Sequence, residues 1–303
     1  KSYLPERYKE GNMAIQILLN GLAVGAVYAL IATGFALIFN ILKFSNFSHG
    51  GLMTSSAFVG YFVSVATGWS LIPILITSML AGGVIAFFGE LVAFRRITIQ
   101  KSANFYYFVS SITLGTLYEA IVTIIIGPGF YVYPMFFKKP AIWIGNFVIQ
   151  TGSMVMLCIS TVVLIILVYV IEKTKTGRGL RAVSFDRDTA YLMGIDVYRT
   201  IRIAFVISGV LGGLAGVFLG IYNFTLTAQL GTMVTKGFIA SVIGGLGSIT
   251  GAVIGAILLG LLETVLIYFI GSGYSPVVVF LVMIVFLFLR PQGIAGSNVQ
   301  EKA

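Results

Sequence analysis

The sequence predicts an all-α, polytopic membrane protein, and three observations lead to that prediction. Hydrophobic residues make up 58% of the chain and charged residues only 10%, whereas soluble domains carry far more charge. Long uncharged stretches recur, each with room for one or two of the roughly 20-residue helices that cross a bilayer. These stretches lack the strict alternation of barrel strands, and a backbone in lipid must satisfy its own hydrogen bonds. Helices are therefore expected throughout.

The first spans come from two uncharged stretches, 13–42 and 52–89. The first stretch is long enough for one tilted span or two short ones, and both possibilities remain open. The second is interrupted near Gly68 and Pro73, residue types that break a helix, so two helices are expected there.

The remaining spans follow in order along the chain. They are expected near 102–126, 147–171, 203–222, 237–248, 250–270 and 274–289. The loop between the first two is rich in the aromatic residues typical of a membrane–water interface, namely Phe130, Tyr131, Tyr133, Phe136, Phe137 and Trp143. The expected total is about eight to ten transmembrane helices, including broken or re-entrant helices, in two inverted repeats.

The positive charge of the chain is concentrated beside the predicted spans. Seven of the 19 basic residues fall between 173 and 202, and Arg95, Arg96 and Lys101 form a second cluster. Basic residues next to spans mark the cytoplasmic side, so both clusters and Arg290 are expected in the cytoplasm, together with the C-terminus. The side of the N-terminus stays open. Because topology explains the net charge of +9, no nucleic-acid partner is expected.

These boundaries divide the chain into three parts. Residues 1–12 are expected to form a polar N-terminal tail, and residues 293–303 a C-terminal tail. Residues 13–292 are expected to form a single transmembrane domain, which includes a cytoplasmic loop at 172–202.

Two stretches place polar and glycine residues between apolar segments: FSNFSHGG at 44–51 and GGLGSITG at 244–251. A new helical pattern follows each, and their Ser and Asn residues are suited to cap it. Paired interruptions of this kind indicate a transport site near the membrane midplane, because helix N-termini carry free N–H groups. Two ordinary interhelical turns explain the same pattern, and that alternative remains open. The residues predicted to line a translocation pathway here are Asn46, Ser48, His49, Gly50, Gly245, Gly247 and Ser248.

The single histidine, His49, has no Cys, Asp or Glu constellation around it in the sequence. No metal site is therefore expected. A hydrogen-bonding or gating role and a packing role both remain open.

Three carboxylates lie in or near apolar runs: Glu90, Glu119 and Glu263. Carboxylates inside a membrane are costly and are usually functional or paired. Glu90 is expected to form an interfacial ion pair with Arg95 or Arg96. Glu263 lies deep in its run and is added to the predicted pathway, and proton coupling through it would define a secondary transporter.

Two lysines, Lys43 and Lys236, flank the interrupted stretches. They are expected to extend toward the membrane surface, as long basic side chains do.

A charged island, GRGLRAVSFDRDTAYLMGID at 177–196, interrupts the apolar chain. It contains Leu180, Val183, Leu192 and Ile195, which a merely solvated connector would not need. A surface that docks a partner and an ordinary interfacial loop are both consistent with this pattern. The chain has no G-x-x-x-x-G-K-[ST] loop for ATP phosphates, nor a Ser/His/Asp or metal motif, so it is expected not to be an enzyme.

Three segments resemble the branched-chain amino acid ABC transporter permeases, most closely their H-type subunit. Residues 172–217 resemble the cytoplasmic loop and following helix, residues 20–50 the N-terminal stretch with its N-F-[AS]-H-G motif, and residues 236–263 the G-G-x-G-S-x-x-G block. One departure stands out: the family usually has an Arg-Pro pair after the third span, where this chain has Arg95 and Arg96 before an isoleucine.

The resemblance implies that the island is a coupling loop seated on an ATPase subunit. The residues that match the family's pattern there are Gly177, Arg181, Ala182, Asp186, Ala190, Gly194 and Ile195. It further implies a second homologous permease subunit, two cytoplasmic ATPase subunits that bind ATP and Mg, and an extracytoplasmic solute-binding protein. No cofactor is expected on this chain itself.

The family also implies a place and a cargo. The place is the bacterial inner membrane, with several passes, and the usual cargo is leucine, isoleucine or valine. Urea, amides or another small solute, a proton-coupled secondary transporter, and an intramembrane enzyme or lipid-binding structural protein remain as alternatives.

Overall fold

The computed structural model describes residues 6–137, 141–144 and 147–295, and most of them are helical. The first half contains α1 (Glu6–Leu42), α2 (Ser48–Thr67), α3 (Leu71–Gly89), a π-helical turn η1 (Glu90–Phe94), α4 (Arg95–Ile99) and α5 (Asn104–Ile126). The second contains α6 (Thr151–Lys173), α7 (Lys175–Phe185), α8 (Arg187–Leu192), α9 (Val197–Tyr222), a 3₁₀ turn η2 (Leu230–Met233), α10 (Val234–Gly244), α11 (Ile249–Ile270) and α12 (Ser275–Leu289).

Among the described residues, six helices are long and apolar enough to cross a membrane. They are Ala14–Leu42, Leu71–Ile99, Asn104–Ile126, Thr151–Lys173, Val197–Tyr222 and Ile249–Ile270. The apolar stretches Leu230–Gly244 and Ser275–Leu289, where spans were expected near 237–248 and 274–289, are shorter than the roughly 20 residues that cross a bilayer. The prediction of an all-α, multi-pass membrane protein is confirmed, whereas the two inverted repeats stay a prediction.

Several boundaries differ from expectation. The stretch 13–42 is one continuous helix, and that helix begins at Glu6, inside the segment predicted as a polar tail. Residues 1–5 and 296–303 of the predicted tails lie outside the described residues. The aromatic loop contains a short antiparallel hairpin of β1 (Ala141–Ile144) and β2 (Phe147–Gln150), which the sequence did not predict.

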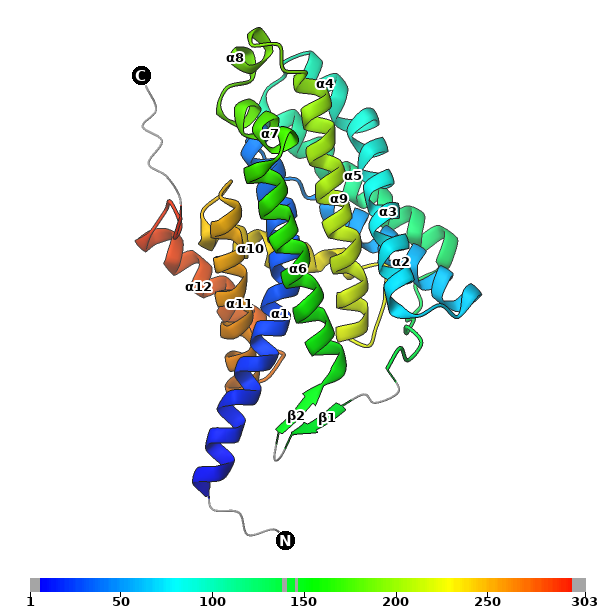
Figure 1. The fold of residues 1–303 in the computed structure, drawn as a ribbon, viewed down its shortest axis with the longest axis vertical. Coiled ribbons are helices and arrows are strands. Elements are labelled where there is room, and N and C mark those ends of the chain that lie inside the picture. Colours follow the sequence, from blue (N-terminus) through cyan, green and yellow to red (C-terminus); the bar gives the residue numbers. More distant parts are fainter. Residues whose placement is uncertain (1–5, 138–140, 145–146, 296–303) are drawn as a thin grey trace.

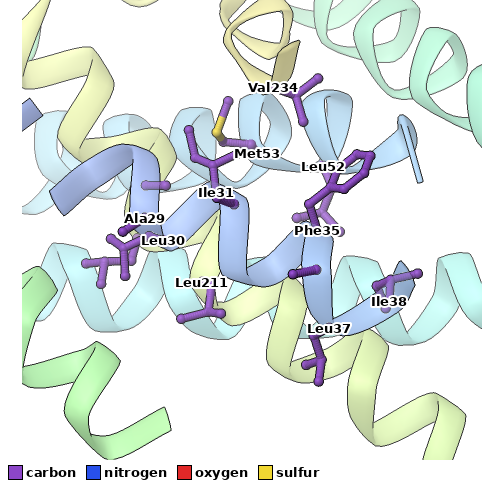
Figure 2. Close-up of a cluster of buried hydrophobic side chains, with 14 of the residues drawn as sticks. Ala29, Leu30, Ile31, Phe35, Leu37, Ile38, Leu52, Met53, Leu211 and Val234 are labelled. Atoms are coloured by element: carbon purple, nitrogen blue, oxygen red, sulfur yellow. The ribbon is translucent and has the colours of Figure 1, made fainter. Parts of the chain in front are cut away.

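Helix α1 is the centre of the bundle. Its residues 23–38 are almost all buried, and α9, α10 and α11 pack around it. Figure 2 shows side chains of α1 such as Ile31 and Phe35 beside Leu52 and Met53 of α2. Since lipid gives helices no hydrophobic reason to associate, such close van der Waals packing holds them together.

Glycines permit the closest helix contacts. A Cβ at Gly82 of α3 would lie 2.2 Å from the carbonyl oxygen of Gly209 on α9. A Cβ at Gly255 of α11 would likewise lie 2.2 Å from the carbonyl oxygen of Ala240 on α10. Any side chain at these positions would force the backbones apart, so the small residues are needed for packing.

The charged segments gather at one end of the bundle. Figure 1 shows α4, α7 and α8 together at that end, while the hairpin and the start of α1 lie at the opposite end. This arrangement agrees with the expectation that the basic clusters near 95–101 and 173–202 share one side of the membrane. It also places the start of α1 on the other side.

Candidate functional site

The first predicted break separates α1 from α2. Residue Lys43, just past the end of α1, has a left-handed backbone with φ of +56°. The side-chain oxygen of Asn46 accepts hydrogen bonds from the backbone N–H of Ser48 at 3.3 Å and from its hydroxyl at 2.7 Å. These bonds close a turn just before α2, whereas the N-cap of α2 is Phe47 and has no side-chain cap, so the predicted Ser or Asn cap is not formed there. The side chains of Asn46 and Ser48 are buried in the bundle.

His49 follows in the first turn of α2 and is buried between α1 and α9. Its Nδ1 lies 3.3 Å from the hydroxyl of Ser208, which donates its hydrogen to the carbonyl of Gly34 at 3.0 Å. A hydroxyl has one hydrogen to give, so while Ser208 donates to Gly34 the matching histidine tautomer is the one in which Nδ1 donates to Ser208. The other ring nitrogen, Nε2, has no hydrogen-bond partner among the described residues.

The glycines after His49 bring three elements into backbone contact. A Cβ at Gly50 would lie 2.4 Å from the carbonyl oxygen of Gly231 in η2. A Cβ at Gly51 would lie 2.4 Å from the carbonyl oxygen of Gly115 in α5. The start of α2 is therefore wedged between α5 and η2.

The second predicted break joins α10 to α11. Gly245 and Gly247 have φ of +107° and +88°, a backbone that favours glycine. The Ser248 hydroxyl accepts from the backbone N–H of Gly251 at 3.1 Å and caps α11, as the sequence predicted. A Cβ at Gly247 would contact Asn40 in the last turns of α1.

The chain end covers this second break. The backbone N–H groups of Ile294 and Ala295 donate to the carbonyls of Ile243 and Gly244, each at 2.9 Å. The first break contacts α5, α9 and η2, and the ring of its Phe47 also lies 5.6 Å from that of Phe238 on α10. A translocation pathway shared by the two breaks stays a prediction.

Glu263 is held in a closed network inside the bundle. Its carboxylate lies 2.5 Å from the Lys236 ammonium, and the Tyr28 hydroxyl donates to it at 2.8 Å. Lys236 also donates to the Tyr28 hydroxyl at 2.9 Å. The expectation that Lys236 extends to the membrane surface is wrong, because a buried carboxylate offers a stronger partner than interfacial water. A pathway role of Glu263 stays a prediction.

Glu90 has a different partner from the expected one. Its carboxylate, 1% exposed, lies 3.3 Å from Nε of Arg202 on α9, not beside Arg95 or Arg96. The guanidinium also lies over the ring of Phe87, 5.3 Å from its centroid. The ion pair ties the π-helical turn to α9, two elements far apart in the sequence.

The island folds into two short helices. The Thr174 hydroxyl accepts from the backbone N–H of Gly177 at 3.1 Å and starts α7. A Cβ at Gly177 would overlap the carbonyl of Ile171, and Arg181 hydrogen-bonds to the same carbonyl. These contacts fix the sharp bend between α6 and α7.

The second helix of the island has its own caps. The backbone N–H of Thr189 donates to the Asp186 carboxylate at 2.8 Å, and this hydrogen bond lowers the pKa of Asp186. Gly194, with φ of +81°, turns the chain after α8, and Ala190 is buried beneath it. Local structure therefore explains why Gly177, Arg181, Asp186, Ala190 and Gly194, which match the family's pattern, occur at these positions. Their role in coupling stays a prediction.

The apolar residues of the island divide into two groups. Leu180 and Val183 are buried against the bundle, so their presence is explained by packing within this chain. By contrast, Leu192 is 83% exposed. Together with its exposed neighbours it forms an apolar tip, defined here as Phe185, Tyr191, Leu192 and Met193. Exposed apolar side chains at the end of the bundle predicted to face the cytoplasm indicate a contact surface.

Arg187 links the island to the first break. Its Nε and Nη2 donate to the carbonyl of Ile41 at 3.2 and 2.7 Å, in the last turn of α1. Burial lowers the pKa of the adjacent Lys43, and the Arg187 guanidinium lowers it further. The family pattern does not single out Arg187, and its distant acceptor on α1 leaves no signal in the sequence.

An exposed ion pair adds a second contact, between Lys101 and Asp188 at 2.8 Å.

Comparisons with known proteins show what this architecture is similar to. Residues 17–287 match the family described as the permease component of the branched-chain amino acid transport system. The permease LivH of Escherichia coli K12 is 29% identical, over 95% of this chain and 97% of that protein. The permease BraD of Pseudomonas aeruginosa is 31% identical over the same shares. Both relatives are named as high-affinity branched-chain amino acid transport permeases.

Solved structures share the fold at low sequence identity. PsaBC of Streptococcus pneumoniae, solved with a Fab, superposes with a TM-score of 0.51 at 13% identity, over 95% of this chain and 97% of that one. An inward-facing transporter of the metal-chelate ABC type gives a TM-score of 0.50 at 16% identity, over 91% and 85%. These likenesses show the fold alone.

Proposed function

The chain belongs to the family of branched-chain amino acid transport permeases, and from that premise we propose that it forms the translocation pathway of an ATP-driven importer of branched-chain, hydrophobic amino acids. A second homologous permease completes the pathway. Two cytoplasmic ATPase subunits bind ATP and Mg and dock on the island, and an extracytoplasmic binding protein delivers the solute. The membrane is the inner membrane of a bacterium.

One observation carries this proposal beyond the family match. The island at 177–196 presents an exposed apolar tip at the end of the bundle, and Arg187 ties its second helix to the end of α1. A partner that moves α8 would therefore pull on Ile41 and on the break that follows it. Asn46 lies in that break, and Ser48 and His49 begin α2 directly after it.

The physical sequence of events follows from these contacts. ATP-driven closure of the two ATPase subunits displaces the apolar tip. The displacement passes through the Arg187–Ile41 hydrogen bonds to the α1–α2 break and shifts α2 against α5 and η2. Because packed helices switch between discrete arrangements, this shift alternates access to the two sides of the membrane. The chain itself acts as a translocation subunit and hydrolyses nothing.

Reconstitution tests the proposal. Proteoliposomes are prepared with this chain, the second permease, the two ATPases and the solute-loaded binding protein. They are expected to transport leucine against its concentration gradient only when ATP is present on the side of the membrane that carries the ATPases. Isoleucine and valine should compete, and urea and acetamide should not. Uphill leucine uptake by this chain alone, driven by a pH gradient, would contradict the proposal, and so would uptake of urea instead of leucine.

A further inference from the structure

The three membrane carboxylates differ in one respect. Glu90 is paired with Arg202, and Glu263 is paired with Lys236. In the described part of the chain, the side chain of Glu119 has no ion pair and no hydrogen-bond donor. A lone carboxylate inside a membrane is costly, and a cation brought to Glu119 in the assembled transporter would reduce that cost.

Glu119 lies in an open groove between α5, η2 and the start of α2. The groove has a volume of about 310 Å³, at the lower end of the range for ligand sites and suited to a small solute. Its walls include Phe108 and Ile112, and the hydroxyls of Thr116 and Thr232 are the other polar side-chain groups that line it. Apolar walls with few polar anchors are the usual lining of a ligand site.

The position of the carboxylate is fixed by backbone contacts. A Cβ at Gly231 would lie 2.7 Å from Oε1 of Glu119 and 2.7 Å from the Gly50 backbone. The same glycine therefore brings Glu119 next to Gly50, which belongs to the first break. A movement of α2 at that break changes the surroundings of Glu119 directly.

We propose that Glu119 binds the ammonium group of the transported amino acid, with the solute's side chain against Phe108 and Ile112. This inference rests on the proposed function, because it takes the solute to carry an amine. A positive charge balances the unpaired carboxylate, and the apolar walls receive a branched alkyl group. The same cation chemistry has one other source, a Lys or Arg of the second permease.

The first test uses the complete importer in proteoliposomes. Glu119→Gln is expected to lower the rate of ATP-driven leucine uptake at least about 30-fold, because the ammonium group of leucine would lose its charged partner. Losses of this size are typical when one member of a close charge pair at an interface is removed. Glu119→Asp, which keeps the charge, should recover much of the uptake. Because Glu119 has no partner within the chain, neither variant is expected to lower the thermal unfolding midpoint. Thr113→Ala, on the exposed face of the same helix and outside the groove lining, is the matched control and should transport normally.

The second test reads occupancy of the groove rather than transport. A thiol is placed one turn from Glu119 by Thr116→Cys, in a Cys158→Ser background that removes the chain's single cysteine. We expect millimolar leucine to slow its reaction with a water-soluble thiol reagent several-fold. The des-amino analogue 4-methylpentanoate should give no protection, and Glu119→Gln should abolish the protection by leucine.

The outcomes separate this inference from the proposed function. Absence of ATP-driven leucine uptake by the wild-type importer would refute the proposed function. Normal uptake by Glu119→Gln, in an importer whose wild type transports leucine, would refute only the role of Glu119. If a cation of the second permease is the partner of Glu119 instead, leucine should not change the rate of thiol labelling at position 116, and Glu119→Gln should cause the two permeases to dissociate. Either result overturns the inference.

Discussion

Replacing Arg187 with alanine is expected to lower ATP-driven solute uptake by about tenfold or more, within the range of a typical coupling free energy, while the chain still inserts. The guanidinium donates two hydrogen bonds to the carbonyl of Ile41, and no other side chain is recorded as donating to that carbonyl in the described structure. Without them, movement of α8 no longer reaches the α1–α2 break. Uptake and ATP hydrolysis should be measured on the same proteoliposomes, because loss of coupling leaves hydrolysis in place.

Two further variants make this prediction specific. Arg187→Lys keeps the charge but not the forked pair of donors, so partial uptake is expected. Lys101→Ala removes the exposed ion pair with Asp188, which is screened by solvent, so uptake should be nearly unchanged. Equal losses in the Lys101 and Arg187 variants, or parallel loss of ATP hydrolysis and uptake, would contradict a mechanical role for the Arg187–Ile41 contact.

Neutralising Glu263 alone is expected to lower the free energy of unfolding by about 3 kcal/mol, since the variant breaks a buried ion pair. This value is the lower end of the usual range, because the Lys236 side chain is 20% exposed and keeps some contact with solvent. Glu263→Gln would leave the Lys236 ammonium inside the bundle without its counter-charge. Lys236→Met would leave the carboxylate in the same position. Thermal unfolding in a mild detergent, monitored on the purified permease pair, measures both losses.

The double variant Lys236→Met with Glu263→Gln separates structure from proton coupling. Since neither charge remains buried, most of the stability should return. If Glu263 serves only to balance Lys236, ATP-driven uptake should return with it. Restored stability with uptake still abolished would instead assign Glu263 a part in transport itself, either in the predicted pathway or in proton coupling.

The local features of the fold were predictable from the sequence. The spans expected near 102–126 and 147–171 correspond to α5 and α6, because the length of an apolar stretch is enough to define them. The Ser248 cap was predictable because a cap depends on residues a few positions away. The resemblance correctly indicated the family, since its motifs are short and lie in order along the chain.

The partners of the charged residues were not predictable, because they come from distant helices. The sequence paired Glu90 with its neighbours Arg95 and Arg96, but α9 brings Arg202 from 112 positions away. The sequence also predicted that Lys236 extends to the membrane surface, whereas the side chain pairs with the carboxylate of Glu263 on α11. For Leu180 and Val183 the sequence left a docking surface and an ordinary interfacial loop both open, and their burial against distant helices explains them by packing within the chain. For the same reason, composition could not distinguish the unpaired Glu119 from the two paired carboxylates.

The most direct test of the central claim places a thiol on the apolar tip by Leu192→Cys in the Cys158→Ser background. The account predicts that a membrane-impermeant maleimide labels this thiol in inside-out vesicles but not in right-side-out ones, and that a short cross-linker joins it to an ATPase subunit of the assembled importer. Labelling from the outside, or a tip that never cross-links to an ATPase, would contradict the claim that the island receives the driving force.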